Sequence, residues 1–598
     1  MVNLITEHLE IWTSAREPKK NGGRGRGKKA NGQSPHGIKK LCELILELAV
    51  RGKLVPQDPN DEPASLLLEK ITQEKARLIK EGKIKKQKTL PEISEEEKPF
   101  ELPEGWSWAR LGDVASYIQR GKGPRYVDMG CVRVVSQKCV QWSGFDLLQA
   151  RFVDDESLGA YQPERFLQKN DLLWNSTGTG TVGRINVLGE LKANELVADS
   201  HVTVIRSLKV NSDFLWCYVA APGIQLRIEP EHEESLVSGT TKQVELNTGV
   251  VIPLVVPIPP LPEQRRIVAK VDELMALCDQ LEQQQTDSNA THQTLLEILL
   301  TTLTKAADHD EFTQVWQRIA NHFDTLFTTA PSIDQLKQTI LQLAVMGKLV
   351  PQNPTDEPAS VLLEKIAKEK ARLIKEGKLK KQKKLPEISE EEKQFELPDG
   401  WEWVRLAVIT SKITDGDHKT PPRIPEGYRL LSAKNVRNGY LDYDNCDFIS
   451  EQHYLKSRER CLPEPGDLLI VSVGGTIGRI SLVPDDSHFS LVRSVALVKP
   501  LLFSSSYLKH AMNSELLQSS IHSRKRGGAQ PCLYLSEIAQ FMFSLPPLAE
   551  QHRIVAKVNE LMAICDQLQA KLTIQCTTTC HFADTMTEQV VSQKAVQC

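Results

Sequence analysis

The chain has almost no excess of charge of either sign. Its 74 lysines and arginines stand against 77 aspartates and glutamates, so the formal net charge is -3 over 598 residues. Overall charge therefore gives no indication of a nucleic-acid partner, and any such site has to come from local clusters of basic residues. One cluster near the N-terminus lies among glycines and consists of Arg16, Lys19, Lys20, Arg24, Arg26, Lys28 and Lys29.

Long apolar runs are also missing. The most apolar stretch, residues 250–261, contains four prolines and is far shorter than the roughly 20 residues that a membrane-spanning helix needs. The N-terminal segment carries Glu7 and Glu10 and has no apolar core of the kind found in secretory signals. We therefore expect a cytoplasmic protein without a membrane segment.

The twelve cysteines show no paired spacing, so we expect reduced thiols rather than disulfides. One short cluster, Cys576, Cys580 and His581, has the residue types of half a zinc site. No second pair of ligands follows it in the sequence. We therefore expect no bound metal.

Catalytic motifs are absent from the sequence as well. It has no Asn-Pro-Pro-aromatic tetrad, which an adenine methyltransferase would need, and no GxxxxGK[ST] phosphate loop. It also has no nucleophile elbow and no zincin helix. We therefore expect a non-catalytic chain.

Three glycines, Gly178, Gly180 and Gly183, fit the dinucleotide-binding pattern GxGxxG. That pattern requires a helix after the glycines, whereas residues 185–188 (INVL) predict a strand. The matching segment DLLIVSVGGTIGRI, which begins at Asp467, has no equivalent of Gly180. We therefore favour a tight turn over a cofactor site. The turn either brings its backbone and Arg184 close to a phosphate or base edge, or is a structural hairpin.

What the sequence does contain is a large internal repeat. The segment Gly52–Trp108, which begins GKLVPQ and ends ELPEGWSW, returns 295 positions later at Gly347–Trp403 with few substitutions. A second pair, PLPEQRRIVAKV from Pro260 and PLAEQHRIVAKV from Pro547, is offset by 287. This period is far longer than the roughly 20 to 50 residues of solenoid repeats. We interpret it as duplication of a whole functional half.

Constant and variable segments alternate along the chain. Residues 111–259 and 406–546 lie between the repeats, and in them the two halves share only scattered short matches. The length also predicts several domains. We predict five parts: a helical region with a basic flexible arm (1–102), a first variable head (103–259), a central helical spacer (260–397), a second variable head (398–546) and a C-terminal helix (547–598).

After each head, apolar residues recur in steps of four and three, which predicts a helix with a coiled-coil seam. We expect the two helices to bury their seams against each other or against a partner, although each helix could instead pack on its own domain. A helix of about 23 residues would span about 35 Å, close to the roughly 34 to 36 Å between half-sites on B-DNA. The seam residues are Ile267, Val271, Leu274, Cys278 and Leu281, and in the second copy Ile554, Val558, Leu561, Cys565 and Leu568.

Two further helices are predicted in each constant region. An apolar stripe from Ile38 to Leu48 ends before Gly52, and a glycine in that place is typical of a helix C-terminus. The next helix begins near Pro63 and ends at Gly82, and the second half repeats both. The lysine-rich residues 83–88 are balanced by acidic residues 95–97, so we interpret them as solvated surface.

Each head begins with a tryptophan pair and continues as short predicted strands between glycine-rich turns, which predicts a compact mixed α/β domain. The chain as a whole is therefore expected to be an α+β protein, with two such heads joined by antiparallel coiled-coil-like helices in a pseudo-two-fold repeat. Side chains suited to bases and phosphates fall in the loops. In the first head these DNA-binding candidates are Arg120, Lys122, Arg125, Lys138, Arg184, Thr240, Lys242 and Gln243. In the second head they are Lys419, Arg423, Lys434, Asn435, Arg437, Arg479, Arg524, Lys525 and Arg526.

These features together resemble the specificity subunit of type I restriction-modification enzymes, in the subgroup with a long N-terminal conserved arm. The resemblance covers nearly the whole chain. It is carried by GKLVPQ, by the pair PPLPEQRRIVAKVDELM and PPLAEQHRIVAKVNELM, by ELPEGW and ELPDGW at the start of the heads, and by the turns that follow each DLL.

The resemblance implies a division of labour. In that family, two target recognition domains each read one half of a bipartite site in double-stranded DNA, and the helical regions set the spacing and dock two methyltransferase subunits. Catalysis, S-adenosylmethionine, ATP and Mg would then belong to the methyltransferase and restriction subunits, and this chain would bind no cofactor. Two alternatives stay open: a non-catalytic scaffold whose heads bind protein, and a specificity subunit of a methylation-only complex.

Overall fold

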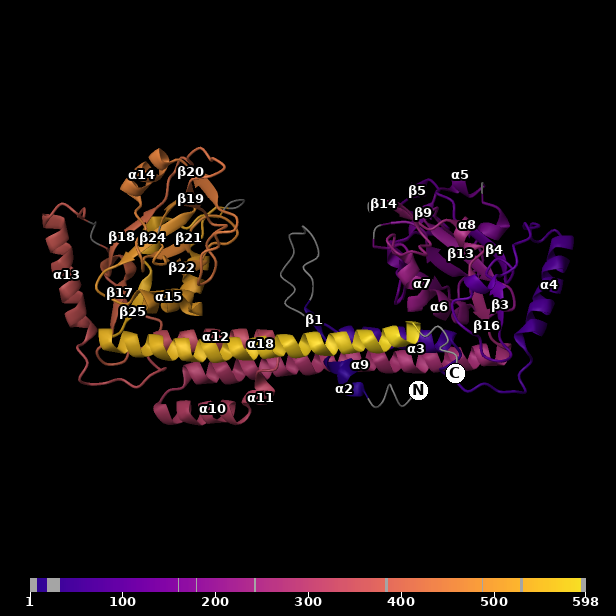
Figure 1. The fold of residues 1–598 in the computed structure, drawn as a ribbon, viewed down its shortest axis with the longest axis horizontal. Coiled ribbons are helices and arrows are strands. Elements are labelled where there is room, and N and C mark those ends of the chain that lie inside the picture. Colours follow the sequence, from indigo (N-terminus) through magenta and orange to yellow (C-terminus); the bar gives the residue numbers. More distant parts are fainter. Residues whose placement is uncertain are drawn as a thin grey trace. The chain divides into compact units, whose positions relative to one another are not determined.

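A computed structural model gives the fold and describes residues 8–18, 33–159, 161–178, 180–240, 243–381, 385–486, 488–527 and 531–592. The chain forms two compact units. Unit 1 consists of Met1–Asn289 and Ile574–Cys598, and unit 2 consists of Ala290–Thr573. Two helices of 45 residues, α9 (Leu261–Lys305) and α18 (Leu548–Ser592), contribute to both units. Each unit also contains one variable head (Figure 1).

Unit 1 has a helical base. The apolar face of α3 (His36–Val50) shares one core with residues 267–278 of α9 and residues 580–586 of α18. His36 Nε2 lies 2.9 Å from Asp584 Oδ1 and connects α3 to α18. The short helix α2 (Leu9–Ser14) inserts Trp12 into the same core, where its side chain is fully buried.

Next to α2, the strands β1 (Glu17–Pro18) and β2 (Gln33–Ser34) pair with each other. Between them lies most of the basic N-terminal cluster. Its members Lys19, Lys20, Arg24, Arg26, Lys28 and Lys29 are outside the residues that the structure describes.

Head 1 is built on two four-stranded sheets. The main sheet has the order β11-β10-β13-β4 and is antiparallel throughout. The second sheet has the order β12-β6-β9-β5, and the first and last strands of the head, β3 and β16, pair with each other. Because β3 pairs with β16, the head begins and ends at the same place, beside the start of α9.

The bounds of the elements in head 1 are as follows. The strands are β3 (Ser107–Arg110), β4 (Ala115–Arg120), β5 (Tyr126–Val127), β6 (Arg133–Val135), β7 (Val140–Gln141), β8 (Gly144–Phe145), β9 (Arg151–Val153), β10 (Leu172–Asn175), β11 (Ile185–Val187), β12 (Leu196–Ala198), β13 (Val202–Ser207), β14 (Ser238–Thr240), β15 (Gln243–Glu245) and β16 (Val255–Ile258). The helices are α5 (Asp155–Leu158), α6 (Ser212–Ala220), α7 (Pro222–Gln225) and α8 (Thr248–Val251).

Unit 2 repeats this plan. The sheet order β18-β24-β21-β22 corresponds to β4-β13-β10-β11, and β20-β19-β23 corresponds to β9-β6-β12. The pair β17 and β25 closes head 2 as β3 and β16 close head 1. The helix α12 takes the place of α3, and its apolar face shares a core with residues 554–565 of α18 and residues 296–303 of α9.

The strands of head 2 are β17 (Glu402–Arg405), β18 (Thr410–Asp415), β19 (Tyr428–Leu431), β20 (Asp447–Ile449), β21 (Leu468–Val471), β22 (Ile480–Leu482), β23 (Phe489–Leu491), β24 (Val495–Pro500) and β25 (Met542–Leu545). The helices of unit 2 are α10 (His309–Asn321), α11 (Phe323–Leu326), α12 (Ala330–Val345), α13 (Ala359–Lys375), α14 (Glu451–Arg460), α15 (Ser505–Asn513), α16 (Glu515–Ser523) and α17 (Leu535–Ala539).

The predicted fold class is confirmed, since both heads are mixed α/β domains on long helices. The predicted helix ends are confirmed too. The helix α3 ends at Val50 before Gly52, α4 (Ala64–Lys80) ends before Gly82, and both glycines have the positive φ of a helix C-terminus. Among the described residues, no helix combines the length and apolar character that crossing a membrane requires.

The apolar seams are buried, but each seam has its partners in its own unit. Ile267 and Val271 of α9 lie in the unit 1 core with α3 and α6, whereas Ile554 and Val558 of α18 lie in the unit 2 core with α12 and α15. The seams therefore do not pair with each other as expected. Each helix has 45 residues instead of the expected 23, about 68 Å at 1.5 Å per residue, so the length match to one DNA turn is wrong as well.

The other seam residues follow the same division. Leu274 and Cys278 are buried in the unit 1 core and Leu281 is half-buried against it. Cys565 is buried in the unit 2 core, and Leu561 and Leu568 are half-buried against that core. The start of α9 meets the end of α18 in unit 1 and the end of α9 meets the start of α18 in unit 2, which is the order of an antiparallel pair.

Candidate nucleic-acid interface

Four loops of head 1 meet at the edge of the main sheet where β4 and β10 end. These are residues 121–125 after β4, residues 136–142, the turn 176–184 after β10, and the hairpin β14–β15. Arg120 Nη1 donates to Glu245 Oε1 of the hairpin at 2.6 Å, and Thr177 of the turn bridges to Glu245 as well. Asn175 Nδ2 donates to the carbonyl oxygen of Gln137 at 2.9 Å. These contacts make the four loops one surface.

Two of the DNA-binding candidates in head 1 form hydrogen bonds within the head. Arg120 pairs with Glu245 and also reaches the carbonyl oxygen of Ser176 at 3.3 Å. Arg184 donates to Gln141 Oε1 at 2.7 Å and to the carbonyl oxygen of Gly180 at 2.8 Å. Their guanidinium groups hold the loops together.

Of the other candidates in head 1, three have described side chains. Lys122, Arg125 and Lys138 are exposed, and the Lys122 ammonium lies 5.8 Å from the ring centre of Tyr161. Thr240 and Gln243 face each other in the hairpin β14–β15. The side chains of these two residues, and the whole of Lys242, lie outside the described part of the chain.

Several cations of head 2 pair with nearby acids. Arg423 and Lys434 both contact Asp447 at 3.2 Å, and Arg437 Nη2 donates to Asp442 Oδ2 at 3.0 Å. Exposed ion pairs of this kind contribute only about 0–1 kcal/mol. Arg423 and Lys434 can therefore exchange a carboxylate for a phosphate or a base edge at small cost.

A second group of cations lies just after α16. Arg526 Nη2 donates to Glu537 Oε1 at 2.7 Å, and Arg524 lies 3.8 Å from the same carboxylate. Between them, burial lowers the pKa of Lys525. Lys419 is exposed in the loop after β18, and Arg479 is half-buried at the start of β22.

Asn435 does not lie on the surface, and its prediction as a DNA contact is corrected here. The side chain is fully buried. Its Oδ1 accepts from the backbone N–H of Ser432 at 3.0 Å, and its Nδ2 donates to the carbonyl oxygen of Asp442 at 3.0 Å. Asn435 therefore closes the loop that presents Lys434 and Arg437.

A cluster of charged side chains that the sequence did not predict lies at the end of β18. Asp415 Oδ1 accepts from Arg460 Nη2 at 2.6 Å, and His418 Nε2 lies 3.0 Å from Asp415 Oδ2 and 2.8 Å from Arg460 Nη2. The motif DGDH at residues 415–418 carried a signal for part of this cluster. Arg460 had none, because it comes from α14, 45 positions further along the chain.

The glycine-rich turns are followed by strands, as predicted, and not by the helix that the dinucleotide-binding pattern requires. The strand β11 follows the turn of head 1, and β22 follows the turn of head 2. Gly178, Gly180, Gly183, Gly474 and Gly478 all have positive φ, which explains why glycine is needed there. In both heads the turn bridges to the segment near the end of the head, at Thr177 with Glu245 and at Val473 with Cys532.

The repeated motifs around each head build a buried junction with the long helix. Trp106 Nε1 donates to Glu263 Oε2 at 2.9 Å, and Gln57 Nε2 donates to Glu263 Oε1 at 3.3 Å. In unit 2, Trp401 Nε1 donates to Glu550 Oε2 at 3.0 Å. Burial raises the pKa of both Glu263 and Glu550. These motif residues attach the heads to the helices and are not available to DNA.

The aspartate at the start of each DLL motif is also structural. Asp171 is fully buried and accepts two hydrogen bonds from Arg206, both at 2.7 Å. In head 2, Asp467 accepts from Lys499 Nζ at 2.6 Å. Burial raises the pKa of both aspartates, against the effect of the paired cation.

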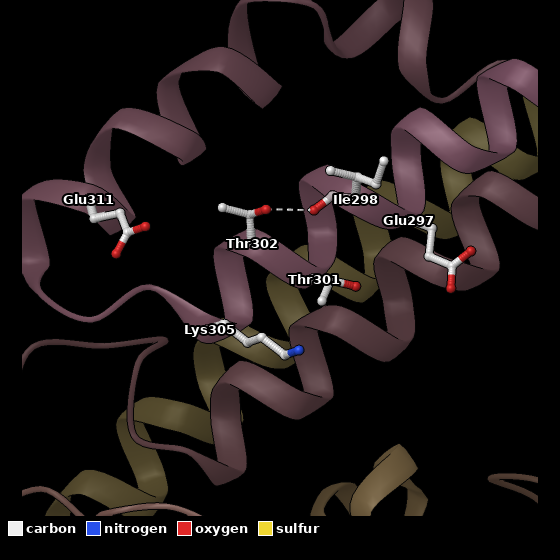
Figure 2. A pocket seen from close by; sticks show the side chains of 6 residues that line it. All are labelled: Glu297, Ile298, Thr301, Thr302, Lys305 and Glu311. Carbon is white, nitrogen blue, oxygen red and sulfur yellow. Dashed lines mark hydrogen bonds between the residues drawn. The ribbon is translucent and has the colours of Figure 1, made fainter.

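One open groove lies in unit 2, at the end of α9, with a volume of about 480 Å³. Figure 2 shows its lining side chains, which are Glu297, Ile298, Thr301, Thr302, Lys305 and Glu311. None of them is among the DNA-binding candidates. In the cluster of Cys576, Cys580 and His581, for which no bound metal was expected, both thiols face the carbonyl oxygen of Arg16. Within the described ranges no three His, Cys, Asp or Glu side chains are grouped to hold a metal.

Known proteins similar to this chain fall in one family. The family described as the type I restriction modification DNA specificity domain matches residues 103–288 and 398–577. The EcoAI specificity subunit of Escherichia coli is 40% identical over 98% of this chain and 99% of its own length. The EcoEI specificity subunit of the same species is 37% identical over the same shares.

Other similarities are more distant. The EcoBI specificity subunit of Escherichia coli is 22% identical over 56% of this chain and 58% of its own length. The solved HsdS subunit of Thermoanaerobacter tengcongensis has a TM-score of 0.40 and 16% identity, over 83% of this chain and 99% of that chain. The two matched domains and the two full-length relatives show that this chain belongs to the family of type I restriction-modification specificity subunits.

Proposed function

We propose that this chain is the DNA-reading subunit of a type I restriction-modification complex, in which each head binds one half of a bipartite site. One observation carries the proposal. The main sheets of the two heads have the same strand order and the turns after β10 and β21 bridge to corresponding segments, but most of the side chains on the surrounding loops differ. Two domains that bind one common ligand would keep the same displayed side chains, whereas two readers of different half-sites would not.

The energy of base contacts supports the use of two heads. A good bidentate contact to a base contributes about 1 to 3 kcal/mol of discrimination. Two or three such contacts in one head would give about 2 to 9 kcal/mol, which only partly covers the roughly 4 to 10 kcal/mol that separates specific from non-specific binding. Two heads on one chain reach that range comfortably.

We further propose that the duplicated helical regions dock two methyltransferase subunits, and that restriction subunits join them in the cytoplasm. The segments 52–108 and 347–403 are nearly the same, which suits two copies of one partner. Methyl transfer from S-adenosylmethionine to adenine, and ATP- and Mg-dependent translocation and cleavage, belong to these partners. This chain contributes recognition and neither a catalytic group nor a cofactor site.

A head exchange tests the proposal. Residues 111–259 of the full chain, assembled with its methyltransferase subunits, are replaced by the corresponding segment of another specificity subunit. Selection from a random pool of duplexes then shows the preferred site. We expect one half-site to change, while the other half and the spacer stay the same. A change in both halves, or in the spacer alone, would contradict the proposal.

The same selection separates the alternatives. A protein-binding scaffold would enrich no bipartite sequence from the pool. A methylation-only complex would enrich the bipartite site and methylate it, and addition of restriction subunits and ATP would then produce no cleavage of unmethylated DNA.

A further inference from the structure

The loops after β4 and β18 leave the main sheet in the same way. In head 1 the backbone N–H of Lys122 donates to the carbonyl oxygen of Ala198 at 3.0 Å, and in head 2 that of Asp417 donates to the carbonyl oxygen of Leu491 at 2.9 Å. The residue before each donor is a glycine. A Cβ atom would lie 2.1 Å from the carbonyl oxygen of Ala198 at Gly121 and 2.0 Å from that of Leu491 at Gly416. Both loops therefore leave the sheet through the same backbone contacts.

The segments beyond these anchors differ in length and in part of their side chains. Head 1 continues with four residues, KGPR at 122–125, and head 2 with seven, DHKTPPR at 417–423. Both carry a lysine and end in Pro-Arg, but only head 2 has Asp417, His418 and a second proline, so the lysine and the arginine are spaced differently. Because the anchors are backbone atoms, these side chains can change without loss of the loop geometry. The backbone contacts at which the loops leave the sheet are the same in both heads, whereas the loop sequences differ.

The turns after β10 and β21 differ from these loops, because several of their residues are the same in both heads. Its serine, two of its glycines and its arginine recur in both heads, as Ser176 and Ser472, Gly178 and Gly474, Gly183 and Gly478, and Arg184 and Arg479. An element that meets phosphate, or that holds the fold, needs the same groups in both heads, since phosphate is the same at every base pair. An element that reads bases must differ between heads with different half-sites.

The variable loops also present suitable groups to solvent. In head 2 the side chains of His418 and Arg423 are 59% and 61% exposed, and Lys419 is exposed beside them. Asp415 holds His418 and Arg460 next to each other. In head 1, Arg125 is exposed and Lys122 lies over the ring of Tyr161. Lysine and arginine are the side chains that most often contact guanine in the major groove.

We infer that residues 121–125 and 416–423 are the base-reading loops of the two heads. Lys122 and Arg125 determine the half-site accepted by head 1, and His418, Lys419 and Arg423 determine the half-site accepted by head 2. This inference rests on the proposed function, and it selects five of the exposed side chains as the specificity determinants. Arg184 and Arg479 support the loops or meet phosphate.

Two double variants test the assignment: Lys122→Ala with Arg125→Ala in head 1, and His418→Ala with Lys419→Ala in head 2. Each is made in the full chain, assembled with its methyltransferase subunits and selected against a random duplex pool. We expect each variant to lose about 5-fold to 140-fold of discrimination at one or more base pairs of one half-site. The other half-site should be unchanged, so each variant controls for the other.

Lys509→Gln is the matched control for loss of a positive charge. Lys509 lies on α15, the helix of head 2 that packs against α12, and this variant should read both half-sites as the wild type does. Thermal unfolding checks the fold of each variant. If an alanine pair lowers the unfolding temperature, the milder changes Arg125→Gln and Lys419→Gln replace it, and they should relax the same half-sites.

Three results would overturn the inference. Equal weakening of binding to all sequences would assign these side chains to phosphate. Unchanged preferences at both half-sites would remove them from the interface. In both cases the wild type still enriches a bipartite site, so the proposed function stands. If the wild type itself enriches no bipartite site, the proposed function fails and the loop assignment fails with it.

Discussion

The indole of Trp106 donates a hydrogen bond from Nε1 to Glu263 Oε2 at 2.9 Å, and so connects the first strand of head 1 to the first turn of α9. Both side chains are buried. Unit 2 forms the same bond between Trp401 and Glu550, at 3.0 Å. The repeated motif at the start of each head therefore bonds to the repeated motif at the start of the long helix in the same unit.

Loss of the indole donor should destabilise this junction. In Trp106→Phe the buried carboxylate of Glu263 loses one of its two donors, and an unsatisfied buried group of this kind costs about 1–3 kcal/mol. We expect faster hydrogen exchange in residues 52–108 and in the first turns of α9, and a lower unfolding temperature for unit 1.

Trp108→Phe is the control for loss of indole volume. The Trp108 ring packs against Phe100 in a tilted arrangement, with ring centres 5.1 Å apart, so it has a similar volume without the bond to Glu263 that Trp106 makes. Its replacement should have the smaller effect. Equal effects of the two substitutions would show that packing, and not the hydrogen bond, holds the junction.

The buried aspartate at the start of the DLL motif is paired with arginine in head 1 and with lysine in head 2. The two cations can therefore be exchanged as a test. Asp171 is buried opposite Arg206, and its counterpart Asp467 is paired with Lys499. We expect Arg206→Lys to keep head 1 folded, because a lysine already serves at this place in head 2. Arg206→Met should cost about 3–5 kcal/mol, since it leaves a buried carboxylate without its cation.

Urea unfolding followed by the near-UV signal of the head tryptophans measures both variants. A result in which Arg206→Met is as stable as Arg206→Lys would show that Asp171 is protonated in the folded head and does not need the pair.

Features that depend on local spacing were predictable from the sequence. The helices that end before Gly52 and Gly82 follow from apolar stripes and glycine caps, which depend on neighbouring residues only. The strand after the glycines of head 1 followed from the run INVL. The length of α9 did not, because residues 283–294 (QQQTDSNATHQT) have no apolar period and still form helix.

Features that depend on how a loop closes, or on contacts between distant residues, were not predictable. An asparagine in a glycine-containing loop is usually exposed, so nothing in the sequence around Asn435 reveals that its amide closes the loop from inside. The pair of Asp415 and Arg460 joins a strand to a helix 45 positions away, and only the fold brings them together. Residue type alone does not tell which cations are exposed. The structure shows that Arg120 and Arg184 form hydrogen bonds within the head, whereas Arg125 is exposed to solvent.

A buried histidine gives unit 2 a pH dependence of its own. Burial lowers the pKa of His510 to about 4, and its Nε2 lies 3.1 Å from Asn559 Oδ1 of α18. As the pH falls below about 6.5, the unfolded chain takes up a proton that folded unit 2 accepts only near pH 4. Stability is therefore full above pH 6.5 and is lost through this window, by about 2 kcal/mol between pH 7.5 and pH 5.

Unit 1 supplies the internal control for this effect. The equivalent nine-residue helix α6 carries Cys217 at the position of His510. Hydrogen exchange at pH 7.5 and pH 5 should show loosening of α15 and not of α6, and His510→Gln should abolish the difference. Loosening of both helices to the same extent would assign the effect to other groups.

The anchors of the reading loops can be tested at their glycines. Gly416 packs its α-carbon against the carbonyl oxygen of Leu491, where a Cβ atom would lie 2.0 Å away, so Gly416→Ala must displace the loop and break the Asp417 hydrogen bond. We expect a loss of about tenfold or more in discrimination at the half-site of head 2, with the half-site of head 1 unchanged. Gly189→Ala is the control for the glycine-to-alanine change, because a Cβ atom there meets no atom within 4 Å and its φ is not positive. If Gly416→Ala reads its half-site as well as Gly189→Ala does, then the position of this loop does not determine specificity, and base reading must be sought on the other loops of head 2.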